Sequence, residues 1–322
     1  MFSAAFFLVV FLVTLLFFVI RQVPKNPKMG LTFSESYAEY LGLDYQQVYQ
    51  AILSDLSPDM IRLPVYWGQV QPLPDQWDWS KTDWLVEESS RANIPLTLAV
   101  GLKVPRWPEC YLPDWLVGAS DSAQFDARMK FIEQTVERYK TSPVLKRWQI
   151  ENEPFFPFGQ CVFQTTLSQL DEEIALVRRL DPSHPIVLTV SGEGEPWFPL
   201  ARRADILGVS LYRVTGSALF GYIPFPFSAL GYRLFMGINR LWVPNLLISE
   251  LQAEPWFLEE DAPKDIETVS TLFTADDLRD HVVFAKRTGV SEMHLWGVEW
   301  WYFLREHGKD GLWKTAQELF SS

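Results

Sequence analysis

The sequence predicts a (β/α)8 barrel, and the prediction rests on the character, number and spacing of its apolar runs. Short apolar runs rich in β-branched residues alternate with longer polar stretches of helical character. Uninterrupted apolar runs are typical of strands buried on both faces of a parallel sheet. Eight such strand–helix units follow residue 28, and eight is the number that closes this barrel. A doubly wound open sheet is the competing architecture, but no G-x-G-x-x-G turn follows the first predicted strand.

The eight predicted strands are apolar runs that turn-forming or charged residues interrupt. Because parallel strands share one direction, we expect their carboxyl ends to meet at one mouth of the barrel. In chain order the strands are MGLTF from Met29, MIRLPVYW from Met60, PLTLAVGL from Pro95, LKRWQIEN from Leu145, PIVLTVS from Pro185, DILGVSLY from Asp205, PNLLISE from Pro244 and EMHLWGV from Glu292.

Helical stretches are expected between most of these strands. Clear examples are DYQQVYQAILSDL, FDARMKFIEQTVERYK and LSQLDEEIALVRRL, the last with Leu167, Leu170, Ile174 and Val177 at helical spacing. The connection from residue 214 to residue 242 is longer, aromatic and rich in Gly and Pro. We expect an irregular crossover with a distorted helix there; alternatively, this segment caps the site or touches a membrane surface.

The N-terminal segment differs in kind from the rest. Residues Ala4–Ile20 are uncharged and almost entirely apolar, and their 17 residues reach the lower limit for a membrane-spanning helix. No A-x-A site follows them, so an uncleaved signal anchor is favoured over a cleaved signal peptide. We therefore expect a transmembrane or signal-anchor helix in residues 1–22, a linker in residues 23–28 and one catalytic domain in residues 29–322.

Composition limits the classes of partner. The formal net charge is −12, and no cluster of Lys and Arg offsets it, so nucleic acid is not an expected partner. The 14 tryptophans suit either core packing or stacking on sugar rings. The four histidines are dispersed without an H-x-x-x-H pair, so we expect no metal site, and no cofactor motif is present.

The two cysteines, Cys110 and Cys161, leave two alternatives open. They do not form a C-x-x-C pair, which argues against a zinc or redox motif. Two buried free thiols would suit a reducing compartment. A disulfide between the loops after the third and fourth strands would require an oxidising one.

The fourth predicted strand ends in WQIENEP, which places two carboxylates where catalytic groups of such barrels lie. Glu151 and Glu153 are two residues apart, so an extended chain would point both side chains to the same side. Pro154 then ends the strand. An acidic residue at a strand end is more often solvated surface than a catalytic group, so the motif needs a partner elsewhere.

That partner is the LLISE run that ends in Glu250 at the seventh predicted strand. Together, ENEP and this glutamate resemble glycoside hydrolase clan A, which includes family 5 cellulases and mannanases and several β-galactosidase families. The resemblance covers residues 29–322 and implies a retaining (β/α)8 enzyme that needs no cofactor. It implies that Glu153 is the acid/base, that Glu250 is the nucleophile and that Asn152 holds the sugar 2-hydroxyl.

Retaining hydrolysis gives an independent reason for two carboxyl groups. One must be protonated above the glycosidic oxygen while the other is ionised below the anomeric carbon. The resemblance further implies that Arg62 lies beside the nucleophile, that Tyr212 hydrogen-bonds it and that Trp296 forms the floor of the sugar site. Two departures weaken a family 5 assignment: Ser210 stands where many members have a histidine, and AVGLKVPRW lacks the usual third-strand histidine.

Other acidic and aromatic residues were weighed for the same site. Glu254 is an alternative nucleophile, although it lies past the strand end, and Glu151 is expected to brace the barrel instead of acting as the acid. Glu193 and Glu195 are expected to be loop carboxylates, with substrate contact as the alternative. Three tryptophans that follow strands two, three and five are candidate subsites: Trp67, Trp107 and Trp197.

These observations predict a retaining glycosidase that cleaves β-glycosidic bonds of an oligosaccharide, polysaccharide or simpler glycoside. The alternative is a carbohydrate-binding pseudoenzyme on the same barrel. We expect the barrel to lie outside the cytoplasm, where polymeric glycans occur, anchored through the N-terminal helix. Arg21, Lys25 and Lys28 oppose this placement, because cations beside a membrane span favour the cytoplasmic side.

Overall fold

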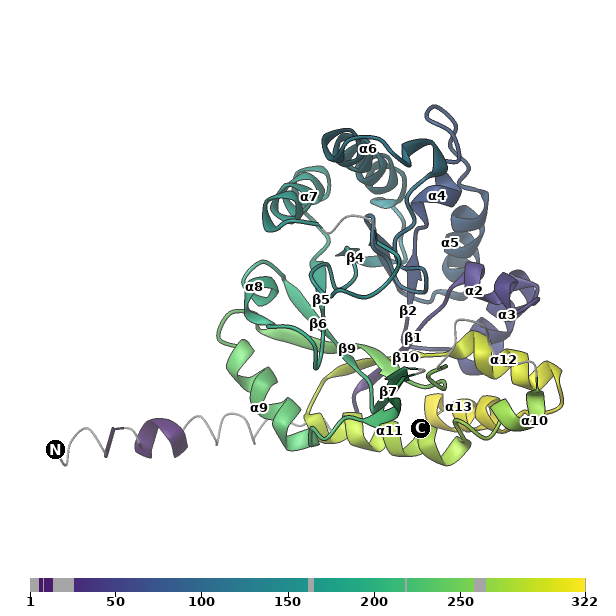
Figure 1. Cartoon of the computed structure of the whole chain (residues 1–322), viewed down its shortest axis with the longest axis vertical. Helices are drawn as coiled ribbons and strands as arrows, with labels where there is room; N and C mark the ends of the chain where they lie inside the picture. The colour runs from purple at the N-terminus through teal and green to yellow at the C-terminus, as the bar shows by residue number, and fades with distance from the viewer. Residues whose placement is uncertain are drawn as a thin grey trace.

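Eight parallel strands close into a barrel, which confirms the predicted fold class (Figure 1). The computed structural model describes residues 6–7, 9–13, 26–161, 165–217, 219–257 and 265–321. The strand order around the barrel is β1-β10-β9-β6-β5-β4-β3-β2. The bounds are β1 (Lys28–Thr32), β2 (Met60–Pro64), β3 (Leu96–Val100), β4 (Leu145–Ile150), β5 (Ile186–Ser191), β6 (Ile206–Leu211), β9 (Asn245–Gln252) and β10 (Glu292–Trp296).

Each of the eight predicted apolar runs contains one barrel strand. The strands are buried almost throughout, as β2, β3 and β5 show along their whole length. Helices on the outside and packed side chains on the inside remove both faces from water, so neither face needs polar residues. The β6–β9 pairing aligns Ser210 with Glu250, which places these two positions side by side at the barrel mouth.

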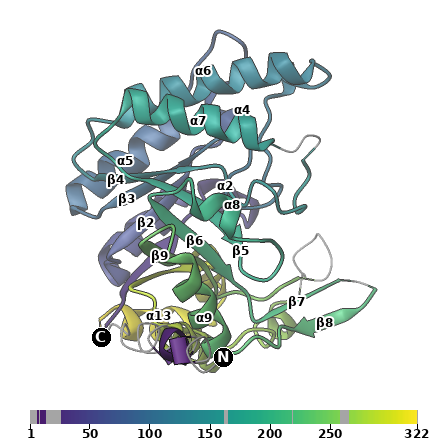
Figure 2. The same ribbon diagram turned by 90° about the vertical axis from the view of Figure 1, so that its left-hand side faces the viewer.

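Helices surround the barrel, as Figures 1 and 2 show. The α7 helix begins at the residue predicted for it, and a capping box between Thr166 and Gln169 satisfies its first backbone donors. The bounds are α2 (Glu35–Tyr40), α3 (Tyr45–Ala51), a π-helical turn (Ile52–Leu56), α4 (Trp67–Val70), α5 (Ser80–Ala92), a 3-10 turn (Asp114–Leu116), α6 (Asp121–Tyr139), α7 (Leu167–Leu180), α8 (Phe198–Ala201), α9 (Ala229–Asn239), α10 (Ile266–Val269), α11 (Ala275–Thr288), α12 (Val298–Glu306) and α13 (Gly311–Phe320).

The long connection after β6 is an irregular crossover with a helix, as expected. It contains an antiparallel hairpin of β7 (Val214–Ser217) and β8 (Gly221–Pro224), and then α9. The hairpin projects from the barrel in Figure 2. The side chain of Gln252 holds its base: it accepts from the backbone N–H groups of Arg213 at 2.9 Å and Val214 at 3.0 Å and donates to the Val214 carbonyl at 2.8 Å.

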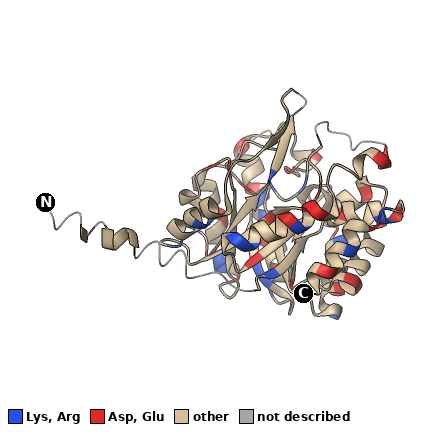
Figure 3. Ribbon diagram, turned by 90° about the horizontal axis from the view of Figure 1, so that it is seen from below, with Lys and Arg blue, Asp and Glu red and all other residues tan. Residues whose placement is uncertain are grey.

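The N-terminal segment is described only in part. Residues 6–7 and 9–13 are helical, whereas the remainder of the predicted anchor and residues 14–25 lie outside the described residues. Among the helices that the structure describes, none combines the length and the apolar character needed to cross a membrane. Over the barrel, Lys and Arg are interspersed with Asp and Glu (Figure 3).

Candidate active site

Glu153 and Glu250 line the same pocket at the carboxyl ends of the strands. Glu153 lies three residues past the end of β4, and Glu250 lies near the end of β9. The pocket has a volume of about 360 Å³, and both glutamates are almost fully buried at its base. The structure therefore brings together two carboxyl groups that are 97 residues apart in the sequence (250 − 153).

Glu250 lies next to a permanent positive charge. The Arg62 guanidinium donates to it through Nη1 at 2.9 Å, and the Tyr212 hydroxyl donates to its other oxygen at 3.1 Å. Arg62 is itself 2% exposed, so little water screens the ion pair. The guanidinium and the hydroxyl together fix the orientation of the Glu250 carboxylate.

Glu153 lies in the opposite environment. Burial raises the pKa of its carboxyl well above the ordinary value, and the negative charges of Glu250 and Glu109 raise it further. Its one side-chain hydrogen bond in the described part of the chain comes from the hydroxyl of Ser210. Ser210 occupies the position where the clan often has histidine, so a neutral hydroxyl replaces an ionisable partner. These surroundings favour the protonated form of the carboxyl group.

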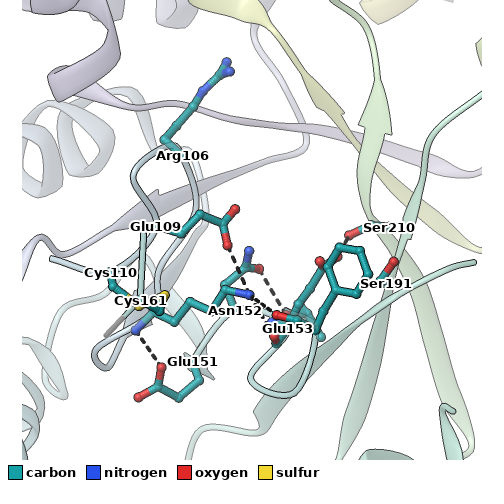
Figure 4. A network of polar contacts seen from close by, with 12 residues as sticks. Arg106, Glu109, Cys110, Glu151, Asn152, Glu153, Cys161, Ser191 and Ser210 are labelled. Carbon is teal, nitrogen blue, oxygen red and sulfur yellow. Dashed lines mark hydrogen bonds and ion pairs between the residues drawn. A yellow bond between two sulfur atoms is a disulfide. The ribbon is translucent and has the colours of Figure 1, made fainter. Parts of the chain in front are cut away.

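The backbone turns sharply between the two glutamates of the ENEP motif. Glu151 and Glu153 have φ values of 56° and 43°, in the left-handed region that non-glycine residues rarely adopt. The expectation that both side chains point to the same side is therefore wrong, because the chain is not extended here. Figure 4 shows the two carboxyl groups pointing apart. Backbone strain of this kind costs roughly 1–3 kcal/mol and is common at functional sites.

Glu151 braces the barrel mouth, as expected. Its carboxylate accepts from the backbone N–H groups of Leu102 at 2.8 Å and Lys103 at 2.6 Å, and Arg128 lies 3.6 Å away. Gly101 allows this approach, because a Cβ there would come within 2.6 Å of the Glu151 carboxyl group. The contact ties the loop after β3 to the end of β4.

Asn152 is oriented by the same network. Its Oδ1 accepts from Arg62 at 2.6 Å and from the Thr189 hydroxyl at 3.1 Å. Its Nδ2 is buried and has no hydrogen-bond partner among the described residues. A buried amide donor without a partner is costly, which makes this nitrogen available to a ligand oxygen.

Glu109 contributes a third carboxyl group to the pocket and was not predicted from the sequence. Its pKa is raised to about 7 by burial, while Lys103, whose ammonium lies 3.4 Å away, opposes the rise. Figure 4 shows Glu109 directed toward the Asn152–Glu153 segment. Nothing in the local pattern WPEC distinguishes this glutamate from a surface residue.

The loop that carries Glu109 is held by a disulfide between Cys110 and Cys161, which decides between the two alternatives for the cysteines. Their Cα atoms are 5.2 Å apart, and the bond joins the loops after β3 and β4. Gly159 packs against Glu109, and a Cβ there would lie 2.9 Å from the Glu109 Cβ. The disulfide thus lies directly beside the third carboxyl group.

Arg106 occupies the barrel mouth in a way that the sequence did not predict. Its guanidinium lies between the rings of Tyr37 and Trp296, at 4.1 and 4.2 Å from their centroids. It also forms ion pairs with Glu254 and Glu299, the second at 2.6 Å. Trp296 is therefore covered by an arginine and is not among the residues that line the carboxylate pocket, so its role as the floor of the sugar site stays a prediction.

The ion pairs of Arg106 also involve Glu254, the alternative candidate for the nucleophile. Its carboxylate is paired with Arg106 and does not line the pocket of Glu153 and Glu250. The alternative nucleophile is thus committed to a buried ion pair. The other loop glutamates lie closer: Glu193 lines the pocket, and the backbone N–H of Ser191, a pocket-lining residue, donates to Glu195 at 2.8 Å.

The three tryptophans predicted as candidate subsites lie in different places. Trp67 is fully buried, its ring stacks on Phe131, and it has no surface to offer a substrate. Trp107 is 46% exposed in the loop after β3 and remains a candidate. Trp197 lines a separate pocket. Tyr212, which was predicted for the site, lines the carboxylate pocket. The other aromatic and aliphatic residues that line it were not predicted: Phe156, Phe158, Ile223, Phe225 and Trp256.

Comparison with known proteins gives structural likeness only. No family model matches the chain, and no curated protein matches it in sequence. A β-galactosidase from Halorubrum lacusprofundi superposes with a TM-score of 0.55 and 13% identity over 84% of this chain and 52% of that one. GH5_18 from Streptomyces cattleya superposes with a TM-score of 0.54 and 15% identity, over 84% of this chain and 70% of that one. Xylanase 10B from Thermotoga petrophila superposes with a TM-score of 0.56 and 13% identity, over 84% of this chain and 82% of that one.

These likenesses establish the fold. The chain has the (β/α)8 barrel that these three solved structures have. It spans about half the length of the β-galactosidase from Halorubrum lacusprofundi, which is the larger protein.

Proposed function

We propose that this protein is a retaining β-glycosidase in which Glu153 is the acid/base and Glu250 the nucleophile. One observation carries the proposal: two carboxyl groups line one pocket in opposite electrostatic environments. Glu250 is paired with Arg62 at 2.9 Å, whereas burial and neighbouring negative charge raise the pKa of Glu153. Separated pKa values are what acid and nucleophile need at the same pH.

The chemistry follows from these positions. Glu250 attacks the anomeric carbon while Glu153 gives its proton to the leaving oxygen, and a covalent glycosyl-enzyme forms. Glu153, now ionised, takes a proton from water, which attacks the same carbon and releases Glu250. The unpartnered Nδ2 of Asn152 is available to hold a sugar hydroxyl beside the reacting carbon. The substrate is a β-linked glycan or glycoside.

A panel of aryl β-glycosides tests the proposal. We expect turnover of at least one sugar, with the first product formed in the β configuration as seen by proton NMR. Glu250→Gln should lower kcat by at least about 1,000-fold, because it removes the covalent step. Binding of sugars without turnover by the wild-type protein would favour the pseudoenzyme instead, and an α product would exclude retention.

We further propose that the barrel is held at a membrane by residues 4–20 and lies outside the cytoplasm. The Cys110–Cys161 disulfide supports an oxidising compartment, while Arg21, Lys25 and Lys28 argue for the opposite orientation. Protease treatment of intact cells or spheroplasts tests this. The barrel should be digested before lysis; its survival until the membrane is broken would refute the external placement.

A further inference from the structure

A second pocket lies beside the candidate active site, between the loop after β5 and helix α9. Its volume is about 470 Å³, within the range of small-molecule sites. The walls are almost entirely aromatic and aliphatic, which suits an apolar ligand. The lining side chains that define it, named here the Trp197 pocket, are Trp197, Phe198, Phe227, Phe235, Ile238 and Trp242.

Four polar side chains interrupt this apolar lining: Glu193, Glu195, Tyr232 and Asn239. Three of their polar atoms have no hydrogen-bond partner within the part of the chain that the structure describes. They are the hydroxyl of Tyr232, Oδ1 of Asn239 and Oε1 of Glu193. Tyr232 is 3% exposed and Asn239 is 6% exposed. Buried polar groups normally find partners, so three together indicate that a ligand supplies them. The ligand then carries both a donor and an acceptor next to an apolar body.

Glu193 connects this pocket to the proposed chemistry, because it lines both the Trp197 pocket and the pocket of Glu153 and Glu250. The carboxylate pocket is also apolar on the side of the hairpin, where Ile223 and Phe225 contribute. A ligand that extends from one pocket to the other therefore passes the polar atoms at the boundary and then meets apolar walls.

We propose that the Trp197 pocket binds the alkyl chain of a lipid-linked glycoside. The inference rests on the proposed function and names the substrate class of that site. The sugar occupies the carboxylate pocket, and a hydroxyl- or amide-bearing linker meets Glu193, Tyr232 and Asn239. The chain then lies along Phe198, Phe235 and Ile238, which are 43%, 53% and 44% exposed and so leave the outer end open to a long chain.

Chain length is the variable that tests this assignment. The sugar found by the aryl-glycoside panel is attached to methyl, butyl, octyl and dodecyl aglycones, each assayed below its micelle concentration. KM should fall roughly two- to fourfold for each added methylene until the pocket is filled, because each buried methylene adds apolar contact. A KM that does not change with chain length while aryl glycosides are turned over overturns the inference and leaves the proposed function standing.

A matched pair of variants separates the pocket from the general apolar surface of α9. Phe235→Ala removes a pocket wall, whereas Leu234→Ala removes a neighbouring side chain, 38% exposed, that does not line the pocket. Phe235→Ala should abolish most of the chain-length dependence of KM, whereas Leu234→Ala should retain it. Equal losses in the two variants would mean non-specific adsorption, such as membrane docking, and would contradict the proposal.

A binding assay tests the Trp197 pocket even if no glycoside is cleaved. The fluorescence of 11-(dansylamino)undecanoic acid should rise when it binds to the wild-type protein. The same rise should require at least tenfold more of the Phe235→Ala protein, but not of the Leu234→Ala protein. Absence of binding overturns the pocket assignment. Binding without any glycoside turnover refutes the proposed function and the aglycone role together, and leaves an alkyl-chain site of another use.

Discussion

Arg62 is the residue that differentiates the two carboxyl groups of the candidate site. It pairs with Glu250 at 2.9 Å and also holds Asn152 at 2.6 Å, so one guanidinium orients both the proposed nucleophile and the amide proposed to bind substrate. No cation pairs with the Glu153 carboxyl in the described part of the chain, and Ser210 offers it only a hydroxyl. The two carboxyl groups therefore lie in different electrostatic surroundings, because the buried Arg62 guanidinium pairs with Glu250 and not with Glu153.

The role of Glu153 can be separated from that of Glu250 by chemical rescue. Glu153→Ala should slow substrates with poor leaving groups by about 100-fold or more, and spare the first step for substrates with good leaving groups, because these need little protonation. Azide should restore turnover partly, since it attacks the glycosyl-enzyme without a general base. Product analysis should then show a β-glycosyl azide. Failure of rescue, together with equal loss on all substrates, would contradict this role.

Glu109 predicts a pH effect with a definite sign. The acid must be protonated, so kcat/KM should fall as pH rises through the pKa of Glu153. Glu109, whose own pKa is raised to about 7, becomes negative above that pH and raises the pKa of Glu153. Glu109→Gln removes this charge, so the alkaline limb of the kcat/KM profile should move to lower pH.

The matched control for that shift is Glu195→Gln. Glu195 is a half-buried carboxyl whose pKa is also raised to about 7 by burial, but its oxygen accepts from the backbone N–H of Ser191. Its loss should leave the alkaline limb close to that of the wild-type protein. A limb that moves equally in both variants, or moves to higher pH with Glu109→Gln, would contradict the electrostatic role of Glu109.

At the scale of elements, the β7–β8 hairpin depends on one side chain at the end of β9. Gln252→Leu removes three hydrogen bonds to the hairpin base. We expect a loss of roughly 2 kcal/mol in unfolding free energy, given about 0.5–1.5 kcal/mol for each bond. KM should rise because Ile223 and Phe225 line the pocket from this hairpin. An unchanged KM would mean that the hairpin keeps its position without Gln252. The control is Gln46→Leu on the exposed face of α3, which makes the same substitution away from the pocket.

The Cys110–Cys161 disulfide links two loops of the barrel mouth. It closes a loop with a sequence separation of 51 residues, so replacing both cysteines by serine should cost about 2–4 kcal/mol of unfolding free energy. Activity should fall as well, because the loop that carries Glu109 then loses its covalent link to the loop after β4. Denaturant unfolding and kcat/KM measure the two effects. Stability equal to that of the wild-type protein would show that the surrounding packing alone holds the loop.

At the scale of the whole molecule, the barrel is expected to be independent of the N-terminal segment. The first barrel strand begins at Lys28, whose N–H donates to the Ser291 carbonyl at 2.9 Å. Deletion of residues 1–25 should therefore leave kcat/KM on a soluble aryl glycoside within about twofold and move the protein from the membrane to the soluble fraction. Loss of activity with retained circular dichroism would show that the segment contributes to the site.

Local pattern was sufficient for the elements of this barrel. Strands such as β5 are nearly continuous apolar runs, and α7 repeats its buried residues every three or four positions, so period and length distinguish strand from helix. Barrel topology then predicts that the ends of strands four and seven of the barrel share a mouth, which is how Glu153 and Glu250 could be paired from the sequence. Glu193 could be placed at this mouth as well, but not assigned a contact.

Tertiary structure alone decided the contacts that link distant loops. Arg106 and Glu299 are 193 residues apart, and no periodicity in either segment indicates that one arginine covers Trp296 and neutralises Glu254. Glu109 and the pairing of Cys110 with Cys161 depend on how two irregular loops fold over each other. Strands and helices satisfy their backbone groups by repeating a local geometry, whereas loop conformation is set by long-range packing, which leaves no short-range signature in the sequence.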